Sequence, residues 1–319
     1  MIRKLLTALP LAVAFAMPVA AEDFPDRSLR IVHGFGAGGN ADTVSRIIAE
    51  EMSKSLGQPV VVESRPGAGG TVASGYVSKE DPDGYTMQLM VGGHAVAAAL
   101  YNSLPYESVD GFTFISTLGQ FPFMVAARSG EYASMEALIE AAKASPGSIK
   151  IGHSGVGSTQ HLTGELLALR TGAEFLHIPY KGGAAASTAL MGGEVDVVID
   201  TGTVIRPQAD AGVYDILAIT SGQRWPDAPD LPTVAETVAP DFDVVSWTGI
   251  GMPAGVPTEI SDKVRGAVHA ALATPAVSDK IASLGAKPSP STGEEMTNLI
   301  AGQIAVWTDV IATAGIDKR

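Results

Sequence analysis

The chain has 319 residues and a formal net charge of −13, with 46% hydrophobic and 17% charged residues. This composition is typical of a folded soluble protein and excludes an extended disordered chain. An acidic surface repels nucleic acid and anionic lipid, so we expect no nucleic-acid partner. The absence of cysteine excludes disulfide bonds, thiol nucleophiles and a lipid-modified cysteine behind a leader.

The first 21 residues have the order of zones found in a signal peptide. Arg3 and Lys4 form a basic start, residues 5–17 are mostly apolar, and residues 19–21 (VAA) are small enough for a signal peptidase. We therefore predict cleavage after Ala21 and export to the periplasm. The mature charge becomes −15, because two basic residues are lost from a chain of charge −13. The alternative is an uncleaved membrane anchor, although a span needs about 20 apolar residues.

Short β-rich runs alternate with helical patterns from Ser28 onward, which predicts an α/β fold with largely parallel sheets. The first part of the chain predicts strands at 29–32, 58–63 and 85–91, with helices at 44–52 and between Gly70 and Lys79. The middle part predicts helices at 134–144, 161–169 and 184–191, and strands at 149–151, 175–178, 195–200 and 216–220. Two long helices follow, at 261–272 and 294–314.

The independent repetition of this alternation in the middle of the chain indicates two lobes rather than one core. We place the crossings between lobes near Phe123 and Arg224. Residues 22–123 and 225–319 then form a discontinuous first lobe, and residues 124–224 form an inserted second lobe.

The first glycine-rich loop, residues 34–39, follows a predicted strand and opens a predicted helix. Its letters GFGAGG match the G-x-G-x-x-G pattern of dinucleotide sites. Asp42 falls in the first helical turn, where it would repel a pyrophosphate, so a dinucleotide is the weaker interpretation. Another interpretation is that these glycines only form a tight turn. We favour a loop that holds a carboxylate or an ordered water through backbone N–H groups, and its candidate residues are Phe35, Gly36, Gly38 and Gly39.

The second loop, residues 154–159, lies between a predicted strand and a predicted helix. Its hydroxyls and free N–H groups can form an anion cradle without Lys or Arg. The candidate residues are Ser154, Gly155, Gly157, Ser158 and Thr159. Helix capping by Ser158 or Thr159 is the alternative, and it does not exclude ligand contact. A serine nucleophile is disfavoured because residues 152–156 (GHSGV) miss G-x-S-x-G at the last position.

Five further residues are considered for the pocket. Tyr180 and Lys181 follow a predicted strand, and Lys181 lies either near the cleft or in solvent. Asp200 ends the strand at 195–200, a usual place for functional residues in parallel sheets. His153 and His161 lack carboxylates at metal-ligand spacing, so we interpret them as structural or pocket hydrogen-bonding groups. The sequence therefore predicts no metal site and no cofactor.

From about Phe24 to the C-terminus the chain closely resembles the substrate-binding subunits of tripartite tricarboxylate transporters, the TctC or Bug family. The most specific segments are LGQPVVVESRPGAGG at 56–70, DPDGY at 81–85, GSTQHL at 157–162, HIPYKG at 177–182, GGEVD at 192–196 and DLPTVAE at 230–236. The resemblance implies a type II periplasmic-binding-protein fold, with two α/β lobes and the ligand between them.

The resemblance also implies roles for particular loops. It implies that residues 155–159 bind a ligand carboxylate directly, and that residues 35–39 and the loop Ala68, Gly69 and Gly70 reach the ligand partly through water. Asp200 corresponds to the aspartate that ends the G-G-x-V-D strand in the family. The chain departs from the family pattern at 33–39 (HGFGAGG) and at 91–94 (VGGH), which contains the candidate Gly93. Both departures fall at the expected pocket mouth, so the substrate cannot be carried over.

These observations together predict a monomeric, cofactor-free periplasmic receptor. We expect it to capture a small carboxylate, such as a di- or tricarboxylate or another organic acid, and to deliver it to the membrane permease subunits of a tripartite transporter. Because the recognition loops lie on separate lobes, we expect hinge closure on binding. The alternatives are a periplasmic hydrolase or dehydrogenase, for which no nucleophile, base and orienter are assembled, and a ligand-sensing subunit of a signalling system.

Overall fold

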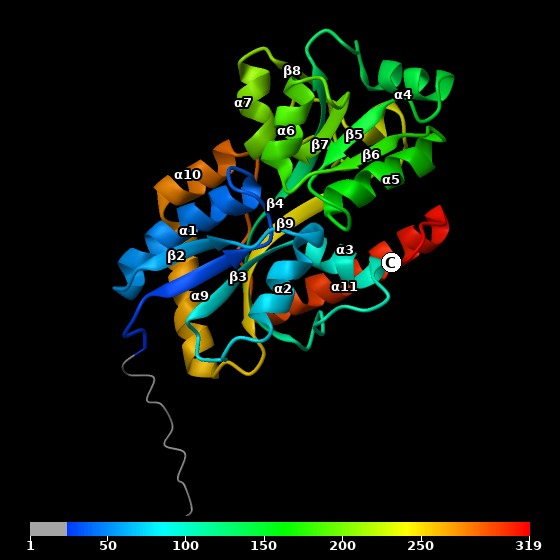
Figure 1. Ribbon diagram of the computed structural model, residues 1–319. Coiled ribbons are helices and arrows are strands. Elements are labelled where there is room, and N and C mark those ends of the chain that lie inside the picture. Colours follow the sequence, from blue (N-terminus) through cyan, green and yellow to red (C-terminus); the bar gives the residue numbers. More distant parts are fainter. Residues whose placement is uncertain (1–23) are drawn as a thin grey trace, which may run out of the picture.

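In the computed structural model, which describes residues 24–319, helices pack on both sides of a twisted sheet (Figure 1). The predicted α/β class is confirmed. Ten strands in this part of the chain form one sheet, whose main path runs β2-β1-β3-β9-β4-β7-β5-β6, and β8 and β10 also pair with β4. Within residues 24–319, no helix combines the length and the apolar character that crossing a membrane requires.

The part of the molecule that we call lobe 1 begins with three parallel strands, β1 (Leu29–His33), β2 (Val60–Ser64) and β3 (Thr86–Val91). The connecting elements are α1 (Asn40–Leu56), η2 (Ala68–Gly70), α2 (Thr71–Val77) and α3 (Gly93–Leu100). Helix α1 buries Val44, Ile47, Ile48 and Met52, which recur on one face of a helix. It ends at Gly57, whose left-handed backbone suits a helix C-terminus.

The long strand β4 (Phe112–Arg128) belongs to both parts of the molecule. Its first part, up to Pro122, pairs antiparallel with β9 (Val245–Pro253). From Phe123 it pairs antiparallel with β7 (Val197–Thr201) and, from Met124, with β8 (Tyr214–Ile219). The change of partners falls between Pro122 and Phe123, where the first crossing between lobes is predicted.

The part that we call lobe 2 surrounds β7 and β8. Strand β5 (Lys150–His153) pairs parallel with both β6 (Leu176–Pro179) and β7. Its helices are α4 (Met135–Ala144), α5 (Thr159–Thr171), α6 (Gly183–Met191) and α7 (Gly202–Asp210). In Figure 1 these green elements form the upper part of the molecule.

The segment after β8 stays with lobe 2 longer than the sequence predicts. Trp225 and Leu231 pack against the apolar cluster of lobe 2, and the short helix α8 (Val234–Thr237) contacts α4. The Ile219 N–H also donates to the Pro232 carbonyl at 2.9 Å. This packing favours a return crossing near Val245 rather than at Arg224. The division into residues 22–123 and 225–319 against 124–224 stays a prediction, and a later return crossing would extend lobe 2 to about residue 244.

The chain then completes lobe 1 with β9 and the C-terminal elements. These are α9 (Thr258–Ala273), α10 (Pro275–Ser283), β10 (Lys287–Pro288) and α11 (Gly293–Ala314). Helix α11 packs against α3, and α9 packs against α1. Helices α9 and α11 correspond to the two long helices predicted at 261–272 and 294–314, which are confirmed.

Gly266 offers a test of the exposed face of α9. A Cβ at this position would meet no atom within 4 Å. Because alanine loses less backbone entropy than glycine on folding, we expect Gly266→Ala to raise the free energy of unfolding by about 0.5–1 kcal/mol. Urea denaturation measures this change, and a lower value would contradict the open helix face.

Candidate functional site

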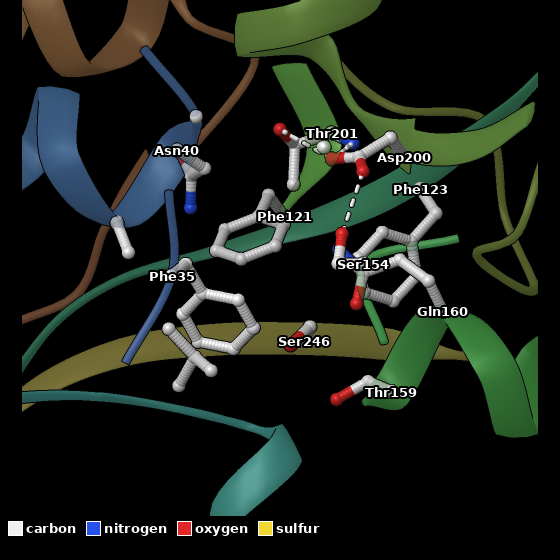
Figure 2. A pocket seen from close by; sticks show the side chains of 14 residues that line it. Phe35, Asn40, Phe121, Phe123, Ser154, Thr159, Gln160, Asp200, Thr201 and Ser246 are labelled. Atoms are coloured by element: carbon white, nitrogen blue, oxygen red, sulfur yellow. Dashed lines mark hydrogen bonds between the residues drawn. The ribbon is translucent and has the colours of Figure 1, made fainter. Parts of the chain in front are cut away.

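A cavity lies where the two lobes meet, and it has about 390 Å³ of space that opens toward solvent. Strands that run through or between the lobes provide Phe121, Phe123 and Ser246 (Figure 2). Lobe 1 adds Phe35, Gly39, Asn40, Ala41 and Val91, and lobe 2 adds Ser154, Thr159, Gln160, Gly183, Asp200 and Thr201.

Four helices of the described chain begin at this cavity. Its lining includes the first residues of α1, α5 and α6, and the residue that precedes α7. The first N–H groups of a helix have no partner within the helix, and the helix dipole places partial positive charge there. Within residues 24–319, no Lys or Arg side chain lines the cavity. The positive potential available to an anion therefore comes from helix N-termini.

The Asp200 carboxylate is the centre of a buried polar network beside the cavity. Its Oδ2 accepts a hydrogen bond from Ser154 Oγ at 2.9 Å, and its Oδ1 accepts one from the Thr201 N–H at 2.7 Å (Figure 2). Gln160 Nε2 in turn donates to Ser154 Oγ at 2.9 Å. A Cβ at Gly183 would lie 2.3 Å from Asp200 Oδ2. Only glycine therefore allows α6 to begin this close to the carboxylate.

Burial raises the pKa of Asp200, and the hydrogen bonds from Thr201 and Ser154 offset part of that effect. The carboxyl can consequently interact with a ligand in two ways. Its protonated form can donate to a ligand carboxylate, and its ionised form can accept from a ligand hydroxyl or amine.

The loop at residues 34–39 is held by Asp42. The Gly38 N–H donates to Asp42 Oδ2 at 3.0 Å, Arg46 Nε donates to Oδ1 at 3.0 Å, and His33 Nε2 lies 3.3 Å from Oδ1. Burial acts to raise the pKa of Asp42, but the hydrogen bonds from Arg46 and Gly38 outweigh it, so this pKa lies below its usual value. The carboxylate occupies a loop N–H that a pyrophosphate would need, which argues against the dinucleotide interpretation.

Loops of the two lobes contact each other around the cavity. The Gly36 N–H donates to the Lys181 carbonyl at 2.8 Å, and Thr203 Oγ1 donates to Asn40 Oδ1 at 2.8 Å. At Gly69, which has a φ of 63°, a Cβ would lie 2.8 Å from the carbonyl oxygen of Val156 in the opposite loop. The structure therefore has the lobes closed over the cavity.

The predicted site residues are distributed over several places. Those that line the cavity are Phe35, Gly39, Ser154, Thr159 and Asp200. A second pocket, which shares Ser154 with the cavity, is lined by Ala68, Gly69, Gly155 and Tyr180, next to Lys181. Gly70 and Gly93 line a small polar hollow within lobe 1. Which of these residues contact the ligand stays a prediction.

The remaining predicted residues make backbone or capping contacts. Gly36 and Gly38 use their N–H groups as described above, and Gly157 has a φ of 80° beside Tyr101. Ser158 is fully buried, and its Oγ accepts from the His161 N–H at 3.2 Å. Its side chain therefore serves as the cap of α5.

Several residues that line the cavity were not predicted, namely Asn40, Ala41, Val91, Phe121, Phe123, Gln160, Gly183, Thr201 and Ser246. The two phenylalanines of β4 lie in an apolar run, which a sequence pattern does not distinguish from core. The position of Thr201 could have been predicted from the sequence, because this residue directly follows a predicted strand that ends in Asp200.

His161 does not line the cavity. It lies with His153 and His177, and one possible ligand atom from each lies within 4.8 Å of the others. Burial and, to a lesser extent, the other histidines lower the pKa of His153 to about 3. Burial and the neighbouring His177 lower the pKa of His161 to about 4. These rings are consequently neutral at pH 7 and are able to coordinate a metal.

Solved structures define the class of this protein. BugD, a periplasmic binding protein, superposes with a TM-score of 0.89 at 34% identity, covering 93% of this chain and 100% of that one. An R. palustris protein with adipate superposes with a TM-score of 0.88 at 34% identity, covering 92% of this chain and 99% of that one. MatC from Rhodopseudomonas palustris with bound malate superposes with a TM-score of 0.86 at 32% identity, covering 90% of this chain and 100% of that one. The predicted periplasmic-binding-protein fold is confirmed.

Within this class the family follows from the sequence match. Residues 44–316 match the family described as tripartite tricarboxylate transporter family receptor, TctC. The chain belongs to this family, so the family predicted from the sequence is confirmed.

Asp200→Asn tests the effect of the buried carboxylate on stability. An unfolded aspartate ionises at about 3.9, and the folded pKa is higher, so the stability of the wild type falls as the pH rises between these values. Asparagine does not titrate. We therefore expect the stability of the variant relative to wild type to increase between about pH 3.5 and pH 7. Urea unfolding at both pH values measures the free energy of unfolding of the variant minus that of the wild type. If this difference stays constant or decreases as the pH rises, the raised pKa is contradicted.

Proposed function

We propose that this protein is a periplasmic receptor that captures a small carboxylate and delivers it to the membrane permease subunits of a tripartite tricarboxylate-type transporter. The convergence of four helix N-termini on a cavity without a lining Lys or Arg, within residues 24–319, is the observation that carries the proposal. Backbone N–H groups and hydroxyls bind a carboxylate in such a place. Family members with adipate and malate support this ligand class.

The shape of the cavity favours a short aliphatic dicarboxylate. Phe35, Phe121 and Phe123 provide apolar surface for methylene groups. Helix α1 begins on the lobe 1 side, and the starts of α5, α6 and α7 lie on the lobe 2 side. One carboxylate of the ligand then meets the starts of α5, α6 and α7, and the other meets the start of α1, where Arg46 pairs with the Asp42 carboxylate. Because no Lys or Arg of residues 24–319 lines the cavity, the charge of a third carboxylate, as in a tricarboxylate, would not be offset.

The proposal involves no catalytic step and no cofactor. The Ser154 hydroxyl donates to Asp200 and accepts from Gln160. Its hydrogen-bond network in the described structure contains no histidine, which is the base that usually activates a serine nucleophile. We further propose that the receptor works as a monomer, with its ligand and the permease subunits as its partners.

The ligand class is tested by titrating the mature protein with succinate, malate, adipate and citrate. A ligand present at ~100 times its Kd adds about 2.7 kcal/mol to the free energy of unfolding. We expect at least one dicarboxylate to produce such a shift in thermal unfolding, and its diamide to produce none because the diamide carries no charge. If none of the four organic acids produces a shift, the proposal is contradicted.

A pair of glycine variants connects this binding to the cavity. In Gly183→Ala the added Cβ would lie 2.3 Å from Asp200 Oδ2, so the start of α6 has to move. We expect this variant to lose ligand binding by calorimetry. Gly266→Ala, also in a helix but with free space around its Cβ, keeps the wild-type affinity. Equal affinities in both variants would place the ligand elsewhere.

Export is a separate part of the proposal. The leader and its cleavage site lie outside the described residues, and we propose that residues 1–21 are removed on export. The intact mass of protein recovered from the periplasm is then expected to correspond to a chain that starts at Glu22. A periplasm-facing protein that retains residues 1–21 would indicate the uncleaved anchor instead.

A further inference from the structure

Three of the six histidines in the chain come together behind the second loop. His153 ends β5, His161 lies in the first turn of α5, and His177 lies on β6. His153 is fully buried and His161 is 4% exposed, whereas the side chain of His177 is 15% exposed. The cluster is thus enclosed by protein, with one side near solvent.

Each ring has one nitrogen beside an acceptor and one buried nitrogen without a partner. His153 Nδ1 lies 3.1 Å from the Gly155 carbonyl oxygen, and the Nε2 atoms of His161 and His177 lie 3.5 and 3.7 Å from Glu165 Oε1. The unpartnered atoms are His153 Nε2, His161 Nδ1 and His177 Nδ1. A histidine that donates to a carbonyl or carboxylate through one nitrogen presents a lone pair on the other, as metal-binding histidines do.

The spacing of the rings is suitable for a single ion. The ring centres are 4.7, 5.7 and 5.4 Å apart. Three imidazoles bound tetrahedrally to zinc at about 2.0–2.1 Å have ring centres about 5.2 Å apart. Gly164 leaves room for this arrangement, because a Cβ there would lie 2.7 Å from His177 Cε1.

We propose that His153, His161 and His177 form a binding site for one divalent transition-metal ion of the zinc type. Three neutral imidazoles favour zinc, copper or nickel over magnesium or calcium, which prefer oxygen ligands. The Gly155 carbonyl orients the His153 ring, Glu165 lies beside the other two rings, and solvent would take the open coordination position. The spacing in the sequence did not predict this site, because His177 joins the other two only through the parallel pairing of β5 with β6.

The position of the site connects it to the anion loop. His153 directly precedes Ser154, and His161 directly follows Gln160, and both of these neighbours line the cavity. A bound ion fixes the two ends of the loop between β5 and α5 relative to β6. The ion therefore acts on the geometry of the loop without contacting a ligand in the cavity.

The proposal is tested with untagged mature protein that has been treated with a chelator and then dialysed. Calorimetric titration with Zn²⁺ is expected to give one ion per chain. Titration with Co²⁺ is expected to give the intense visible absorption of tetrahedral cobalt, and added Zn²⁺ should remove it by displacing the cobalt. Neither measurement depends on ligand binding in the cavity, so this result is independent of the proposed transport function.

Variants assign the ligands. We expect His177→Gln, on an edge strand where a polar side chain is tolerated, to weaken Zn²⁺ binding by more than tenfold, and Glu165→Gln to weaken it by roughly 10–100-fold. The matched control is His269→Gln on α9, whose ring lies 3.0 Å from the Ser291 carbonyl oxygen, and it keeps the wild-type affinity. Far-UV circular dichroism checks that each variant is folded.

Two outcomes would overturn the proposal. One is a wild-type protein that takes up no stoichiometric Zn²⁺ and gives only the spectrum of octahedral Co²⁺, which would make the cluster a set of core histidines. The other is an affinity that falls equally in His177→Gln and His269→Gln, which would place the ion elsewhere. The wild-type titration alone decides the first outcome, even if a variant fails to fold.

Discussion

Among the residues that the structure describes, none that lines the cavity is Lys or Arg, and the rest of the site follows from this constraint. An anion in such a place has to be stabilised by backbone dipoles, so several helices have to begin within reach of it. Backbone groups cannot change rotamer, and their positions depend on how closely neighbouring segments approach. Gly183 shows this dependence, because α6 can begin over the Asp200 carboxylate only without a Cβ. The glycine-rich character of the loops is therefore a packing requirement as well as a source of N–H groups.

The same constraint explains why closure matters. Helix α1 belongs to lobe 1, whereas α5, α6 and α7 belong to lobe 2, so the helix N-termini surround one ligand only when the lobes meet. The contacts that join the lobes here include one backbone hydrogen bond from Gly36 and one side-chain hydrogen bond from Thr203. Single neutral hydrogen bonds contribute about 1 kcal/mol each. A ligand that interacts with both lobes can accordingly shift the balance between open and closed forms.

Sequence reasoning identified the parts of the site that have a local signature. A strand, a glycine-rich loop and a helix in succession located the loops at 34–39 and 154–159, and in the first of these loops the Asp42 carboxylate accepts from the Gly38 N–H. The strands β4 and β9 were not predicted, because their residues are buried on both faces and show no alternation. The cavity residues that they supply, Phe121 among them, were missed for the same reason. The sequence pattern placed the return crossing near Arg224, yet the Pro232 carbonyl beyond it still accepts from the Ile219 N–H of β8.

The continuity of β4 has a consequence for how the molecule comes apart. This one strand is an interior member of the sheet in both lobes, with β9 beside its first part and β7 and β8 beside its second. Neither lobe can lose its fold without stripping hydrogen bonds from a segment that the other needs. We therefore expect the two lobes to unfold together, so that a destabilising change in either lobe lowers the melting temperature of the whole molecule.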